Sequence, residues 1–147
     1  MTRISAVHAW EVFDSRGSPT VAVDVILDSG DRGYSMVPSG ASTGSREAIE
    51  LRDGESGRLG GRGVRRAVER IEGEISTAVL GLDVHDQTRL DGVMTELDGT
   101  KNKGRLGANA ILGVSLAAAR AAACARHLEL HQYLAELYGP ADVRMPV

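Results

Sequence analysis

Apolar and polar residues alternate along the first part of the chain. Between residues 20 and 27, valine or leucine occupies every second position, which is the period of a β-strand with one buried face. Residues 28–31 are Asp-Ser-Gly-Asp and favour a tight turn. The pattern therefore predicts a hairpin in which residues 32–37 return antiparallel, and residues 4–10 predict a third strand of the same meander.

After residue 63 the apolar period changes from two to 3.6 residues, which predicts helices. The first apolar stripe has a charged, solvated opposite face and consists of Val64, Ala67, Val68, Ile71, Ile75, Ala78 and Val79. A second apolar stripe, over residues 90–97, has Asp86 as a candidate N-terminal cap and Gly99 as its C-terminal stop.

The alanine-rich segment 108–125 predicts a central helix, because its small side chains let other elements pack closely around it. Asn109 is a candidate N-cap of this helix. Residues 128–137 predict a short last helix that ends at Gly139. Strands first and helices afterwards is the order of an α+β domain, here a three-stranded antiparallel meander followed by a helical layer.

Length and composition fit one domain without a polymer or lipid partner. The 147 residues can form one core, and with 3% aromatic residues aliphatic side chains and alanine must fill it. A net charge of −3 creates no field that would attract nucleic acid or an anionic membrane. We assign residues 1–139 to the domain and residues 140–147 to a linker-like tail, with 54–63 expected to be a mobile loop.

The sequence also predicts a cytoplasmic protein. The N-terminal residues contain no apolar block before a small-residue cleavage site, and the apolar run 108–119 is too short and too alanine-rich to span a bilayer. Cys124 is the single cysteine, so it forms no internal disulfide, and its alanine-rich surroundings predict that it is buried in a helix.

The segment 37–44, VPSGASTG, carries the candidate chemistry. Residues 40–44 fit the G-x-S-x-G pattern, in which Ser42 would be a nucleophile with Asp98 and His131 as its acid and histidine. That motif requires a mostly parallel sheet, whereas the predicted strands are antiparallel, so a hydrolase is disfavoured. A Walker loop is excluded, because its second glycine would be followed by lysine and not by serine and arginine.

Two interpretations of VPSGASTG stay open from the residues alone. The segment is an ordinary flexible turn, or it is an oxygen-rich loop that binds Mg²⁺ together with a phosphorylated ligand. His127 and His131 are four residues apart and would share a helical face as metal ligands, but no third ligand is evident. His8 and His85 are isolated and are interpreted as structural or surface residues.

Five motifs in order cover most of the chain: FDSRGSPTV at 13–21, VPSGASTG at 37–44, EAIELRDG at 47–54, LDGT at 97–100 and LGANAILGVSL at 106–116. On these motifs the chain resembles the N-terminal domain of enolase, the phosphopyruvate hydratase of glycolysis. The resemblance implies a three-stranded meander followed by helices, in agreement with the periodicity.

The resemblance also implies the role of the loop. The residues expected to contact substrate are Ser39, Gly40, Ala41, Ser42, Thr43 and Gly44, in a loop that closes over the active site. Ser42 is expected to ligate the second, catalytic Mg²⁺ through its hydroxyl and backbone oxygens. The implied reaction removes water from 2-phosphoglycerate, with a lysine base and Mg²⁺ stabilising the enediolate.

In enolases the base, the general acid and the carboxylates of the first Mg²⁺ lie in a C-terminal barrel, which this sequence lacks. No catalytic residue is therefore expected in this chain, and we expect a separately encoded barrel partner, or else that the chain is a fragment. The alternatives are a subunit acting on a related phosphorylated or phosphonate substrate in secondary metabolism, and a non-catalytic interaction module.

The chain departs from the enolase pattern at positions that matter for assembly. Trp10 stands where enolases usually have arginine and Ala22 where they have glutamate, and those charges commonly pair across the dimer interface. An oligomer is still expected, with Trp10 as a candidate contact. Ser18 replaces the usual asparagine of the Asp-Ser-Arg-Gly motif, which is a milder change.

Overall fold

The computed structural model describes residues 2–40, 44 and 46–139. It shows a three-stranded antiparallel sheet in the order β1 (Ile4–Phe13), β2 (Pro19–Leu27) and β3 (Arg32–Met36). The turn between β2 and β3 forms as predicted, with hydrogen bonds from Leu27 N to Asp31 O and from Gly30 N to Leu27 O. The predicted meander is confirmed, and β1 extends three residues beyond the prediction.

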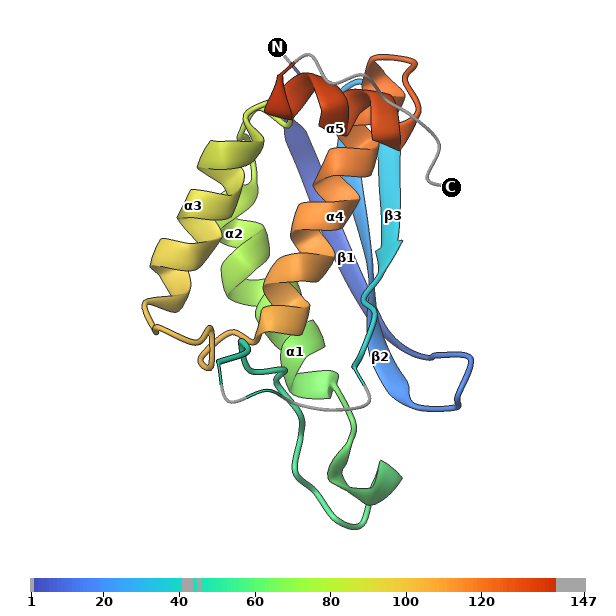
Figure 1. The fold of residues 1–147 in the computed structure, drawn as a ribbon, viewed down its shortest axis with the longest axis vertical. Helices are drawn as coiled ribbons and strands as arrows, with labels where there is room; N and C mark the ends of the chain where they lie inside the picture. Colours follow the sequence, from blue (N-terminus) through green and yellow to red (C-terminus); the bar gives the residue numbers. More distant parts are fainter. Residues whose placement is uncertain (1, 41–43, 45, 140–147) are drawn as a thin grey trace.

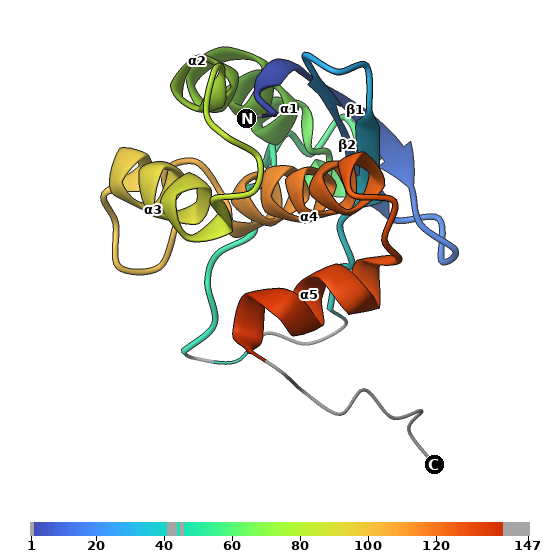
Figure 2. The same ribbon diagram turned by 90° about the horizontal axis from the view of Figure 1, so that it is seen from above.

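The helices cover one face of the sheet, as Figures 1 and 2 show from two directions. A continuous helical segment runs from residue 65 to 79 and contains a π-helical turn. It consists of α1 (Arg65–Arg70), η2 (Ile71–Ile75) and α2 (Ser76–Val79). Its predicted apolar stripe is confirmed, because Val64, Ala67, Ile71, Ile75 and Val79 are fully buried.

The remaining helices are η1 (Leu59–Gly61), α3 (Gln87–Asp98), α4 (Ala108–Ala125) and α5 (Leu130–Tyr138). The predicted boundaries of α3 are confirmed: the Asp86 carboxylate accepts a hydrogen bond from Arg89 N, 3.0 Å, and Gly99 ends the helix with φ 66°. The short turn η1 lies within the predicted loop 54–63.

The alanine-rich helix α4 lies at the centre of the fold, across β2 and β3 (Figure 1). Its backbone approaches β3 so closely that a Cβ atom at Gly33 would lie 2.2 Å from Ala117 O. The expected aliphatic core is confirmed, since buried alanines of α4 pack against the valines of the inner sheet face. The small-residue surface of α4 thus positions the whole helical layer.

Among the described residues, α4 is long and apolar enough to cross a membrane by length and composition, with a mean hydropathy of 1.4 over 18 residues. The prediction that this segment is too short to span a bilayer is therefore wrong, because the helix continues to Ala125. Within the fold 56% of this helix is buried, which is the arrangement of a core helix in a soluble protein.

Two other predictions need correction. Strand β2 is buried on both faces and not on one, because Thr20, Ala22 and Asp24 of its outer face are at most 4% exposed between neighbouring strands. Cys124 is exposed and not buried, and its Sγ lies 3.6 Å from Asp31 Oδ1. The alanines around Cys124 face the core, but the cysteine occupies the remaining face of the helix.

Candidate functional site

The described residues of the predicted loop lie just beyond the end of β3. Thr20 Oγ1 donates a hydrogen bond of 2.7 Å to Val37 O, and Val37 N donates one of 2.9 Å to Val21 O, so the chain stays attached to β2 up to this point. Ser39, Gly40 and Gly44 are described. Ala41, Ser42 and Thr43 lie outside the described residues, so the metal-ligand prediction for Ser42 stays a prediction.

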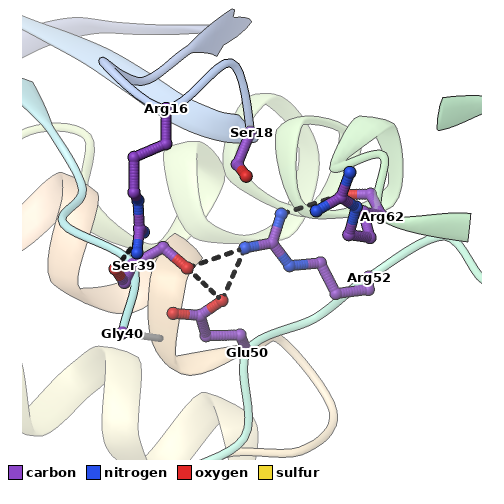
Figure 3. Close-up of a pocket in the computed structure, with 7 residues that line it drawn as sticks. All are labelled: Arg16, Ser18, Ser39, Gly40, Glu50, Arg52 and Arg62. Atoms are coloured by element: carbon purple, nitrogen blue, oxygen red, sulfur yellow. Dashed lines mark hydrogen bonds and ion pairs between the residues drawn. The ribbon is translucent and has the colours of Figure 1, made fainter. Parts of the chain in front are cut away.

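Ser39 is held by three side chains (Figure 3). Its hydroxyl donates to Glu50 Oε2 at 3.1 Å and accepts from Arg52 Nη2 at 3.0 Å. Its carbonyl oxygen accepts a hydrogen bond of 2.7 Å from Arg16 Nη2. Because charged partners engage both the hydroxyl and the carbonyl, Ser39 fixes the position at which the chain enters the predicted loop.

Arg52 connects this network to the sheet and to the segment before α1. Its Nη1 donates to Pro19 O at 2.6 Å and to Arg62 O at 2.8 Å, and its Nη2 pairs with Glu50 Oε2 at 2.7 Å. Only 24% of the Arg52 side chain is exposed. The fixed fork geometry of a guanidinium suits such a role, because one side chain can bind several acceptors at once.

The turn between β1 and β2 places Arg16 in the site. Asp14 accepts hydrogen bonds from the backbone amides of Ser18 and Arg16, both 2.8 Å, and pairs with the Arg16 side chain at 3.2 Å. The amide of Ser18 and then the Arg16 groups hold the pKa of Asp14 below its usual value. Asp14 is thereby kept ionised, which stabilises the turn that carries Arg16.

The other end of the predicted loop is attached to the α3–α4 connection. Gly44 O accepts a hydrogen bond of 3.2 Å from Glu47 N, and Ile49 N donates to Asn102 O at 2.8 Å. Ile49 O in turn accepts one of 2.8 Å from Ala108 N, at the start of α4. Segments on both sides of residues 41–43 are therefore hydrogen-bonded to the body of the domain.

Asn109 does not cap α4 as predicted. Gly107 occupies the N-cap position, and the buried Asn109 side chain accepts a hydrogen bond from Leu51 N, 2.9 Å, and donates one to Leu51 O, 3.1 Å. A Cβ atom at Gly107 would lie 2.5 Å from Leu51 Cβ. Asn109 thus pairs the loop after the predicted site with α4.

A cavity of about 430 Å³ opens beside Ser39. Its lining consists of Arg16, Ser18, Ser39, Gly40, Glu50, Arg52 and Arg62. Sequence reasoning predicted Ser39 and Gly40 as site residues but gave no role to the arginines or to Glu50. Isolated arginines in glycine-containing loops carry no periodic signal, so their convergence becomes visible only in the fold.

Asp98, weighed from the sequence as the acid of a hydrolase, has a structural role. Asp98 is buried, and its Oδ2 accepts a hydrogen bond of 2.7 Å from Leu106 N. Burial opposes ionisation, but the bonds from Thr100 and Leu106 outweigh it and lower the pKa of Asp98. This carboxylate therefore closes the α3–α4 connection and is not free to orient a catalytic histidine.

The histidine pair predicted to share a helical face does not do so. Helix α4 ends at Ala125 and α5 begins at Leu130, so His127 lies in the connection, with φ 53°, while His131 lies on α5. Across residues 2–40, 44 and 46–139, no group of three or more His, Cys, Asp and Glu side chains is placed to hold a metal ion. The described residues alone therefore do not fit a complete Mg²⁺ site.

Comparison with known proteins identifies the family. A model of the enolase N-terminal domain matches residues 4–134. A curated protein of Rubrobacter xylanophilus named Enolase is 59% identical over all 147 residues, which correspond to 34% of its own length. The chain thus spans about a third of the curated relative that it matches. On this evidence, and with the meander and helical layer in agreement, the chain belongs to the enolase family and comprises the enolase N-terminal domain.

Proposed function

We propose that this domain is the loop-bearing part of an enolase-type lyase that dehydrates 2-phosphoglycerate to phosphoenolpyruvate with Mg²⁺. The observation that carries the proposal is the 59% identity to a protein named Enolase over the whole chain. In this proposal a separate chain supplies an enolase-type barrel with the base, the general acid and the remaining metal ligands. The working protein is a cytoplasmic oligomer.

Residues 39–44 have the central role in this proposal. They contact the phosphorylated substrate and close over it, and Ser42 contributes its oxygens to Mg²⁺, an ion that prefers oxygen ligands and stabilises developing negative charge. The hydrogen bonds at Ser39 and Ile49 support this role, because a loop between two attached segments can close reproducibly. Closure would exclude water from the reacting groups.

The experiment combines the chain with a barrel-only enolase chain and follows the absorbance of the enolpyruvate product. We expect turnover only when both chains and Mg²⁺ are present. Ser42→Ala should lower turnover about 10²-fold or more, as the loss of a positioned electrostatic group does, with little effect on association. Ser29→Ala, in the β2–β3 turn, is the matched control and should leave turnover unchanged. A stable complex without turnover on 2-phosphoglycerate would contradict the proposal.

A related phosphorylated or phosphonate substrate is the first alternative outcome of this experiment. Turnover of such a compound, in the absence of activity on 2-phosphoglycerate, would keep the lyase chemistry but change the substrate. The same Ser42→Ala variant then tests whether the loop acts on that substrate as proposed.

A non-catalytic interaction module is the second candidate, and one observation favours it. Trp10 pairs directly with Ala22 across β1 and β2, so neither position carries a charge on the outer face of the sheet. Trp10 is 48% exposed on β1, and Tyr34 and Met36, on β3 across the central strand, are 46% and 55% exposed. Clear binding of the chain to an enolase whose turnover stays unchanged would establish this function in place of catalysis.

A further inference from the structure

Three arginines from separate segments surround the cavity beside Ser39. Arg16 comes from the β1–β2 turn, Arg52 from the segment after the predicted loop, and Arg62 from the residues just before α1. Figure 3 shows Arg16 on one side of the cavity, Arg62 on the other, and Arg52 between them. The arrangement brings together like charges that lie far apart in the sequence.

The charges at this cavity do not balance. Glu50 pairs with Arg52 at 2.7 Å and Asp14 pairs with Arg16 at 3.2 Å. The side chain of Arg62 has no ion-pair or hydrogen-bond partner within the part of the chain that the structure describes. Three guanidinium groups therefore meet two carboxylates, and one positive charge stays uncompensated.

The donors around the cavity divide into two groups. Arg52 is used internally, since carbonyl oxygens, Ser39 and Glu50 occupy both of its terminal nitrogens. The guanidinium of Arg62, Arg16 Nη1 and the hydroxyl of Ser18 have no acceptor among residues 2–40, 44 and 46–139. Arg16 is 49% exposed in its side chain, so it can turn toward a ligand. The cavity thus offers free donors at its mouth, and behind them lies the Arg52–Glu50 ion pair, whose charges cancel.

We propose that this cavity, which we call the arginine pocket, binds one oxyanion group, a phosphate or a carboxylate. Arg16, Arg62 and the Ser18 hydroxyl donate to its oxygens, and Arg62 supplies the positive charge that no carboxylate of the cavity compensates. Planar guanidinium groups match oxyanions with paired, charge-assisted hydrogen bonds. The oxyanion is a free small ion or an acidic side chain of another polypeptide. This pocket is a different site from the Mg²⁺ site proposed to include Ser42.

The arginine pocket also has a structural link to the predicted loop. Arg16 donates to Ser39 O, and Ser39 Oγ bonds to Arg52 and Glu50. An oxyanion bound to Arg16 therefore contacts a side chain that also holds the point where the chain enters the loop. Binding at the pocket is expected to restrict Arg16 and, through it, Ser39.

The test titrates the 147-residue chain with inorganic phosphate at constant ionic strength and follows backbone amide signals by NMR. We expect saturable shifts at Arg16, Ser18 and Arg62. Arg62→Gln should weaken phosphate binding about tenfold or more, the usual effect of removing a charged donor, while circular dichroism stays unchanged. Arg120→Gln removes the same charge from the exposed face of α4 and is the matched control. Arg62→Lys should restore part of the affinity.

The absence of saturable binding, or equal weakening by Arg62→Gln and Arg120→Gln, would overturn the proposal. A second titration, with the barrel-only chain bound, distinguishes the two sources. Displacement of phosphate by that chain identifies an acidic side chain as the occupant, whereas phosphate binding that persists in the complex identifies a free ion. The phosphate titration needs no turnover, so its result is independent of the proposed lyase activity.

Discussion

The Asn109 side chain pairs with both backbone groups of Leu51, at 2.9 Å to the amide and 3.1 Å to the carbonyl. The two residues lie 58 positions apart in the sequence and are both buried. The amide of Asn109 replaces a neighbouring strand, because it offers one acceptor and one donor to an extended backbone. This pair attaches the segment after the predicted loop to the first turn of α4.

Replacing Asn109 with alanine is expected to lower the free energy of unfolding by about 2–4 kcal/mol, since it leaves two buried backbone groups unpaired. Asn102→Ala makes the same chemical change at an exposed position and should alter the stability by less than about 0.5 kcal/mol. Urea denaturation of the three proteins measures both effects. Equal stability of the two variants would show that the Leu51 pairing contributes nothing.

Gly33 and Gly92 should respond in opposite directions to alanine. A Cβ atom at Gly33 would lie 2.2 Å from Ala117 O and from Ala121 N, both backbone atoms of α4. Gly33→Ala must push the helix away from β3, and we expect a loss of about 3 kcal/mol or more. At Gly92, within α3, a Cβ atom meets nothing within 4 Å.

Gly92→Ala is therefore expected to raise the free energy of unfolding by about 0.5–1 kcal/mol, because alanine is the better helix former. Thermal unfolding followed by circular dichroism gives the two values under the same conditions. A Gly33→Ala protein as stable as the wild type would contradict the close approach of α4 to the sheet.

The elements of the fold were predictable because their signals are local. Alternation over residues 20–27 indicates a strand, although not that both of its faces are buried, and the stripe from Val64 to Val79 indicates the buried face of a helix; neither signal needs knowledge of distant residues. Asp86 and Gly99 were identified as helix ends for the same reason, since capping chemistry acts within one turn.

The candidate site was predictable only in part. Asn109 fits the pattern of an N-cap, but its real partner is Leu51, which only the packed fold brings near. Cys124 has apolar neighbours in sequence, yet the helix turns it outward. The arginine pocket is formed by three loops that lie together at one end of the sheet. The local composition of these loops does not indicate that they lie close to one another.

Glu11 should make the stability depend on pH. It lies on the inner face of β1, pairs with the Arg58 guanidinium, and accepts a hydrogen bond of 2.7 Å from Val64 N. The bond from Arg58 is the main cause that lowers the pKa of Glu11 below its ordinary value of 4.5. A carboxyl with a lowered folded-state pKa stabilises the fold above the unfolded value, and this contribution is lost as the pH falls through the folded value.

Glu11→Gln is accordingly expected to be less stable than the wild type by about 1–2 kcal/mol at pH 7. The difference should shrink as the pH falls below about 4.5, where the unfolded carboxyl of the wild type takes up a proton. Urea unfolding at a series of pH values measures it. Glu96→Gln, an exposed change on α3, should give a difference that stays near zero, and a constant deficit of Glu11→Gln at every pH would rule out the linkage.

Cys124 should react in the native protein. Its side chain is exposed at the end of α4, beside Asp31 of the β2–β3 turn, so an aqueous disulfide reagent can reach the sulfur without unfolding. Because Cys124 is the single cysteine, a thiol assay should release one equivalent of thionitrobenzoate per chain without denaturant. Labelling that begins only after denaturation would instead show that Cys124 is buried, as its alanine-rich surroundings in the sequence predict.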